Sequence, residues 1–255
     1  MDFRLLSIGR DVTVAYHRYE GTSKTLPGVM FMGGFRSDMT GTKAAFLEEQ
    51  CKRRHQSFVR FDYTGHGSSS GVFEQCNFTA WLRDAQAVLD ELTLGPQVIV
   101  GSSMGGWLAC LATAARPERI AGLLLVAPAP DFTEALMKPS LPPEAIKALD
   151  KHGVWIAPGA PGEGGYPITR VLLEDGARWS ILPGPVPISC PVRILQGGRD
   201  ASVPWTHALE LAQAIESQDV VFALIKDGDH RLSRPQDLDR LVATLEELLA
   251  NPSVR

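Results

Sequence analysis

The chain has 255 residues, a formal net charge of −4 at pH 7 and a pI near 5.9, with 44% hydrophobic and 21% charged residues. This length and balance predict one globular domain over residues 1–255. The acidic charge argues against nucleic acid or an anionic membrane surface as a partner. The longest apolar run, residues 120–127, is too short to span a bilayer, and the first residues lack a secretory signal pattern, so we expect a cytoplasmic protein without a transmembrane segment.

Short β-branched runs alternate with longer amphipathic stretches along most of the chain. Residues 4–8 and 12–19 come first and predict an antiparallel edge. Further strands are expected at 28–32, 57–61, 97–102, 120–127, 192–196 and 220–225, and helices at 42–54, 79–94, 104–115, 205–217 and 235–249. This alternation predicts an α/β fold with a mostly parallel central sheet and helices on both faces.

Residues 128–191 interrupt this alternation, because they contain 12 of the 18 prolines and a glycine cluster at 159–165. Such a segment cannot form a layer of the sheet, yet it is too hydrophobic for a disordered linker. We interpret it as a cap or lid insertion over the mouth of the sheet; a structural excursion without a role in binding is the alternative. Five of its apolar residues are expected to line a substrate channel: Leu136, Met137, Val154, Trp155 and Trp179.

The sharpest local motif is the G-x-S-x-G sequence around Ser103, which follows a predicted strand and opens a predicted helix. In that setting the motif indicates a nucleophile elbow, in which glycines permit a very tight turn. The segment 67–71 also matches the pattern and contains Ser69. It lies in a polar run without the strand–turn–helix setting, so a loop is the better interpretation of Ser69.

A serine nucleophile needs a histidine base and an acid that orients it, and in this kind of fold they follow the serine in the order acid, histidine. His230 lies in a loop after the last predicted strand, where it can reach the carboxyl ends of the strands. Asp200 follows the strand at 192–196 and is the first choice for the acid. Asp131, which follows the preceding strand, is the alternative. The other histidines after Ser103, His152 and His207, have less suitable positions.

Backbone N–H groups complete the predicted site. The Met104 N–H at the start of the helix and the Phe35 N–H after the glycine pair 33–34 are expected to form the oxyanion hole. The cysteines at positions 51, 76, 110 and 190 are widely spaced, which indicates neither a metal site nor a disulfide framework. No metal or other cofactor is therefore expected.

Taken together, these motifs resemble the α/β-hydrolase superfamily, and within it a mitochondrial branch of acyl-protein (palmitoyl) thioesterases and acyl-glucuronide esterases. The resemblance covers residues 26–245 and rests on the segments 26–29 (LPGV), 39–44 (MTGTKA), 60–65 (RFDYTG), 101–108 (GSSMGGWL), 115–118 (ARPE), 151–155 (KHGVW) and 203–205 (VPW). It implies the α/β-hydrolase fold and a triad of Ser103, Asp200 and His230.

We therefore expect a serine hydrolase that cleaves acyl thioesters or carboxylic esters through an acyl-enzyme, with medium-to-long acyl groups favoured. The substrate would be a small molecule or an acylated protein. A general carboxylesterase of small esters and a non-catalytic ligand-binding protein with the same fold are the alternatives. The pattern leaves the oligomeric state open.

Overall fold

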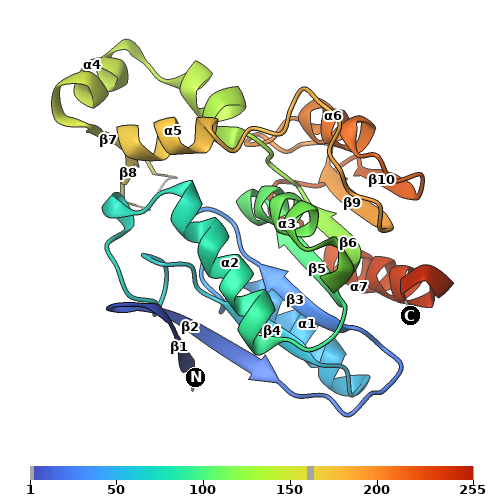
Figure 1. The fold of residues 1–255 in the computed structure, drawn as a ribbon. Helices are drawn as coiled ribbons and strands as arrows, with labels where there is room; N and C mark the ends of the chain where they lie inside the picture. Colours follow the sequence, from blue (N-terminus) through green and yellow to red (C-terminus); the bar gives the residue numbers. More distant parts are fainter. Residues whose placement is uncertain (1–2, 160–163, 255) are drawn as a thin grey trace.

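The computed structural model describes residues 3–159 and 164–254. Its centre is an eight-stranded sheet with the strand order β1-β2-β4-β3-β5-β6-β9-β10. The strands are β1 (Arg4–Gly9), β2 (Val12–Tyr19), β3 (Gly28–Met32), β4 (Phe58–Phe61), β5 (Gln97–Ser102), β6 (Ile120–Val126), β9 (Val192–Gly197) and β10 (Val220–Ile225). Strands β1 and β2 form the antiparallel edge, and the other six run parallel to one another (Figure 1). This confirms the predicted fold class.

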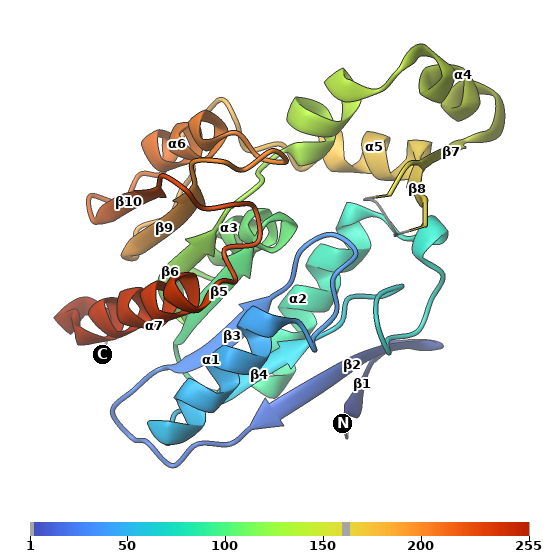
Figure 2. The ribbon, with the colours of Figure 1, turned by 180° about the vertical axis from the view of Figure 1, so that it is seen from behind.

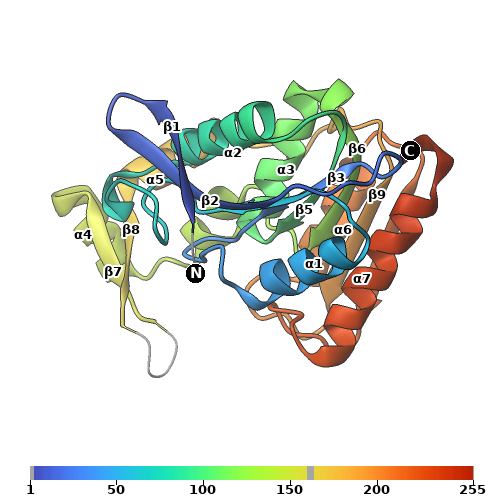
Figure 3. The same ribbon diagram turned by 90° about the horizontal axis from the view of Figure 1, so that it is seen from below.

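Helices cover both faces of the sheet, as Figure 3 shows most clearly. One face carries α1 (Thr42–Arg53) and α7 (Pro235–Ala250), and the other carries α2 (Phe78–Leu92), α3 (Met104–Ala115) and α6 (Trp205–Ala214). Helix α6 ends three residues before the predicted position, because Ile215 is extended and pairs with Val186. Strand β6 ends at Val126 because Ala127 adopts a left-handed conformation with φ 46°.

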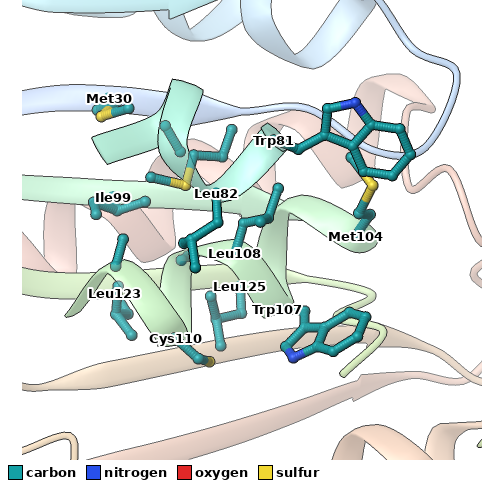
Figure 4. Close-up of a cluster of buried hydrophobic side chains, with 14 of the residues drawn as sticks. Met30, Trp81, Leu82, Ile99, Met104, Trp107, Leu108, Cys110, Leu123 and Leu125 are labelled. Atoms are coloured by element: carbon teal, nitrogen blue, oxygen red, sulfur yellow. The ribbon is translucent and has the colours of Figure 1, made fainter. Parts of the chain in front are cut away.

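The core consists of two apolar layers, one on each side of the sheet. Every residue of β3, β5 and β6 is buried, as expected for strands that are covered on both faces. In the larger layer, strand residues such as Met30, Ile99 and Leu123 face side chains of α2 and α3, including the fully buried Trp81 and Trp107 (Figure 4). Burial of these large side chains fixes α2 and α3 against the strands that carry the predicted site.

The segment 128–191 lies beyond the carboxyl ends of the central strands (Figures 1 and 2). It contains a π-helical turn (Thr133–Met137), a 3-10 turn (Lys138–Ser140), α4 (Pro143–His152), the antiparallel pair β7 (Val154–Ala157) and β8 (Tyr166–Thr169), and α5 (Arg170–Ala177). This is more regular structure than its prolines predict, because Pro142 and Pro143 begin α4, where a backbone N–H is not needed. Residues 160–163 of the predicted glycine cluster lie outside the described residues. No helix in the described ranges is long and apolar enough to cross a membrane.

The close approach of α3 to the end of β3 yields a stability prediction. A Cβ at Gly105 would overlap the carbonyl oxygens of Met32 and Gly33, whereas a Cβ at Gly9 would meet no atom within 4 Å. Gly105→Ala should lower the free energy of unfolding by roughly 1–3 kcal/mol, because overpacking forces the backbone apart. Gly9→Ala should change it by less than about 1 kcal/mol. Urea denaturation of both variants measures the difference, and equal midpoints would contradict the prediction.

Candidate active site

Ser103 lies in the turn between β5 and α3 with φ 55° and ψ −120°, a backbone conformation that is strained for a residue with a side chain. Three hydrogen bonds hold this turn. The Ser103 N–H donates to the Val126 carbonyl at 2.9 Å, and the Ser103 carbonyl accepts from Gly106 and Ala129 at 2.8 and 3.1 Å. A Cβ at Gly101 would lie 2.5 Å from the Gly105 carbonyl oxygen, so the turn requires glycine there. This geometry is that of a nucleophile elbow, with the half-buried Ser103 directly after the carboxyl end of β5.

His230 connects Ser103 to Asp200. Its Nε2 lies 3.1 Å from the Ser103 Oγ, and its Nδ1 lies 2.7 Å from the Asp200 Oδ2. Because an ionised carboxylate only accepts, Nδ1 carries the proton and Nε2 can accept one from the serine hydroxyl. The loops of the two partners are bound together, since Gly198 and Arg199 donate to the carbonyls of Ile225 and Gly228 at 2.7 and 2.8 Å. The three residues therefore form a continuous hydrogen-bonded relay.

The Asp200 side chain is fully buried and makes four hydrogen bonds. Its Oδ1 accepts from the Ser202 and Val203 N–H groups, both at 2.8 Å, and its Oδ2 accepts from Gln196 at 3.0 Å as well as from His230. Burial alone would raise the pKa of Asp200, but the hydrogen bonds from His230 and the backbone outweigh it and hold the pKa below its ordinary value. Asp200 is therefore ionised at neutral pH.

Asp131, the alternative acid, has a different set of partners. Its carboxylate accepts from the Ile181 and Leu182 N–H groups at 2.8–3.1 Å, and no hydrogen bond to His230 is found in the described part of the chain. Burial raises the pKa of Asp131. Nearby, the His207 Nε2 donates to the Pro130 carbonyl at 2.7 Å. Asp131 thus fixes the 181–182 loop, and the structure places Asp200 rather than Asp131 beside the histidine.

Ser69, from the second G-x-S-x-G match, uses its hydroxyl for hydrogen bonds to backbone groups. Its hydroxyl donates to the Asp62 carbonyl at 2.6 Å and accepts from the Ala15 N–H at 2.8 Å. These bonds fasten the loop after β4 to β2. The loop interpretation of Ser69 agrees with this geometry, since the match lacks a following α-helix that begins at the serine.

The backbone that carries the two predicted oxyanion donors passes beside Ser103. A Cβ at Gly34 would be only 3.3 Å from the Ser103 Cβ, so the loop 33–41 between β3 and α1 passes directly beside the serine. Within the described ranges, neither the Phe35 N–H nor the Met104 N–H has a hydrogen-bond partner. Both groups can therefore donate to an oxygen bound at Ser103.

A cavity of about 810 Å³ contains Ser103 and His230. Most of its wall comes from the loop 33–41 and the first residues of α1, together with Gly164, Arg231 and Ser233. None of the five predicted channel residues lines it. Met137 and Trp155 pack against the small apolar cluster of the segment 128–191, while Leu136 and Trp179 pack against the main core, and Val154 pairs with Thr169 in the β7–β8 ribbon. Their contact with substrate stays a prediction.

Lys43 also lines the cavity, a position that the sequence did not predict. Its Nζ donates to the Arg231 carbonyl and lies 3.5 Å from the Ser233 Oγ, so it fastens α1 to the loop that carries His230. Burial lowers the pKa of Lys43 to about 8, although Asp229 and Asp237 oppose the shift. A lone lysine in a predicted helix gives no signal of this role. Among the described residues, no group of three or more His, Cys, Asp or Glu side chains could hold a metal ion.

Comparison with known proteins agrees with this geometry. The model of the alpha/beta hydrolase family matches residues 26–244. The mitochondrial palmitoyl-protein thioesterase ABHD10 of Rattus norvegicus is 39% identical over 238 residues, which cover 93% of this chain and 79% of the relative.

Two solved structures are similar over almost the whole chain. Mouse alpha/beta hydrolase domain-containing protein 10 has a TM-score of 0.88 and 37% identity, covering 97% of this chain and 98% of the mouse chain. A crystal structure of a protein from Agrobacterium vitis S4 has a TM-score of 0.93 and 36% identity, with the same coverage of 97% and 98%. The chain therefore belongs to the alpha/beta hydrolase family and is a hydrolase related to ABHD10.

Proposed function

We propose that this enzyme hydrolyses acyl thioesters and carboxylic esters through an acyl-enzyme on Ser103, with His230 as the base and Asp200 as the acid. The observation that carries the proposal is the relay in which 3.1 Å separates the Ser103 Oγ from the His230 Nε2 and 2.7 Å separates the His230 Nδ1 from Asp200. Ser103 also lies at a strained elbow, and the predicted donors, the Phe35 and Met104 N–H groups, have no hydrogen-bond partner within the described ranges. Both observations support nucleophilic acyl transfer.

The reaction follows from these positions. His230 accepts the Ser103 proton as Oγ attacks the acyl carbonyl, and the Phe35 and Met104 N–H groups stabilise the negative charge on the carbonyl oxygen. Asp200 stabilises the resulting imidazolium, which then protonates the leaving thiolate or alkoxide. A water molecule, activated by the same histidine, releases the acid from Ser103 in the second half of the cycle.

The leaving group determines how much proton transfer from His230 the reaction needs. A thiolate is a far better leaving group than an amine, so thioesters and activated esters require less proton transfer from His230 than peptide bonds do. The rat relative bears the name of a palmitoyl-protein thioesterase, which supports an acylated protein or a small acyl thioester as substrate. We extend the proposal to medium-to-long acyl groups, supported by that name.

Ser103→Ala tests the nucleophile. The variant should fold normally, because the change removes only one hydroxyl, and its kcat should fall by roughly three to six orders of magnitude. Wild-type protein should be labelled by a fluorophosphonate probe, and the variant should not be labelled. Ser69→Ala is the matched control and should remain labelled. Near-normal esterase activity of purified Ser103→Ala protein would contradict the assignment.

Asp200→Asn and Asp131→Asn distinguish the two candidate acids. Asn at position 200 should favour the wrong tautomer of His230 and lower kcat by on the order of 10⁴, whereas Asn at 131 should affect mainly the stability of the 181–182 loop. Steady-state kinetics and thermal unfolding of the two variants measure these effects. A larger loss of kcat for Asp131→Asn would move the acid to the loop after β6.

A chain-length series tests the acyl preference. For p-nitrophenyl esters and acyl thioesters of two to sixteen carbons, kcat/KM should rise with length, because each buried methylene contributes about 0.8 kcal/mol until the site is full. Two added methylenes should then raise kcat/KM roughly tenfold. An optimum at acetyl esters, with a steady decline at greater length, would instead support the alternative of a small-ester carboxylesterase.

A further inference from the structure

The loop 33–41 carries the Phe35 N–H, but it has no regular secondary structure to aim that group. Its own backbone contributes two weak turns, from Ser37 to the Gly34 carbonyl at 3.1 Å and from Gly41 to the Asp38 carbonyl at 3.3 Å. Arg36, which directly follows Phe35, has φ 60°, in the left-handed region that disfavours residues with a side chain. A strained turn of this kind persists only where its surroundings hold it.

The side chain of His66 supplies that support. Its Nε2 accepts a hydrogen bond from the Arg36 N–H at 3.1 Å. Its Nδ1 lies 3.3 Å from the Thr64 carbonyl oxygen, which can only accept, so Nδ1 carries the ring proton and Nε2 has a lone pair for Arg36. The imidazole therefore matches both partners in its neutral form, whereas an imidazolium would direct a second N–H against that of Arg36.

The surroundings of His66 keep the ring in that state and orientation. The side chain is buried, and the rings of Tyr63, Phe73 and Trp81 pack edge-on around it with centroid distances of 5.1–5.7 Å. The Trp81 indole also donates to the Thr64 carbonyl at 3.1 Å, which holds the second partner of the histidine in place. Burial lowers the pKa of His66 to about 4, so the ring is neutral at physiological pH.

Two neighbours of His66 hold the ends of the same loop. The Tyr63 hydroxyl donates to the Gly33 carbonyl at 3.3 Å, and the Asp62 Oδ1 accepts from the Met39 N–H at 2.6 Å. Only His66 among these three contacts the strained middle of the loop, one peptide away from the proposed donor. The segment after β4 thus serves as a rigid template for the loop.

We propose that His66 is a positioning residue for the oxyanion hole: by accepting from the Arg36 N–H, it holds the Phe35–Arg36 turn so that the Phe35 N–H is aimed at the oxygen bound at Ser103. This inference rests on the proposed acyl-enzyme mechanism. Its consequence is that loss of the acceptor nitrogen impairs transition-state stabilisation while substrate binding is retained.

Two substitutions separate the hydrogen bond from the packing. His66→Phe keeps an aromatic ring among the surrounding aromatic side chains but removes both nitrogens. His66→Gln places an amide oxygen near the position of Nε2. The His66→Phe variant should lose roughly 10- to 100-fold in kcat with KM within about threefold of wild type. The His66→Gln variant should recover a large part of that loss. Rates are expressed per active site, counted by titration with a fluorophosphonate.

An alkyl boronic acid provides a second readout, because its tetrahedral adduct on Ser103 places an oxygen in the hole. Its affinity should fall in parallel with kcat/KM in His66→Phe. Ser69→Ala is the control: it breaks the bonds of the segment after β4 to Asp62 and Ala15 but none to the loop 33–41, so it should lower the melting temperature and leave kcat per active site unchanged. A purely structural role of His66 would give that same pattern for His66→Phe, and this result would overturn the proposal. Activity that survives in Ser103→Ala would instead overturn the mechanism itself.

Discussion

The tight turn at Ser103 is the constraint on which the rest of the site depends. At φ 55° the serine leaves the strand direction abruptly, and α3 begins at the next residue. The turn brings the first turn of α3 so close to the end of β3 that Gly105 has no room for a side chain. The loop 33–41 passes beside Ser103 as well, since a Cβ at Gly34 would lie 3.3 Å from the Ser103 Cβ. The strained turn at Ser103 and the oxyanion hole proposed beside it therefore depend on the same close packing.

Around this turn, the structure holds irregular loops by buried polar contacts instead of by regular pairing. Asp200 has four hydrogen-bond donors, and Lys43 fastens α1 to the histidine loop. Arg60 provides a further example, because it pairs with the buried Glu48 at 2.7 Å and donates to the Met39 carbonyl. A buried ion pair contributes little net stability, but removal of one partner is costly. Such contacts therefore fix loop geometry more than they stabilise the fold.

The two faces of the site differ in how they are built. The side with Ser103, Asp200 and His230 depends on the loops after β5, β9 and β10, each of which contributes one of these residues. The side with the cavity depends on the loop 33–41, whose Phe35 ring also packs against Phe132 and Tyr166 of the segment 128–191. Arg36 stacks on the Tyr166 ring as well, with its guanidinium 4.4 Å from the centroid. That segment consequently contacts the oxyanion side of the site directly, although its predicted channel residues lie elsewhere.

The sequence by itself predicted the strands and helices in their order along the chain, the strand–turn–helix setting of Ser103, and Asp200 and His230 as its partners, because these depend on local patterns: buried strands, a glycine-flanked serine, and polar residues directly after strands. The order of the strands within the sheet came only from the structure. The sequence still left Asp131 as the alternative to Asp200, since both follow a strand at the same edge, and only the folded chain shows which one meets His230. No sequence pattern indicated that His66 and Lys43 contact the site, for a related reason. Their roles arise from single hydrogen bonds to backbone groups 30 and 188 residues away along the chain, and no periodicity or motif encodes such contacts. The five residues expected to line a substrate channel show the opposite limit: their hydrophobicity marked them as apolar surface, but only the tertiary packing, against the main core or within the segment 128–191, decided which surface each one faces.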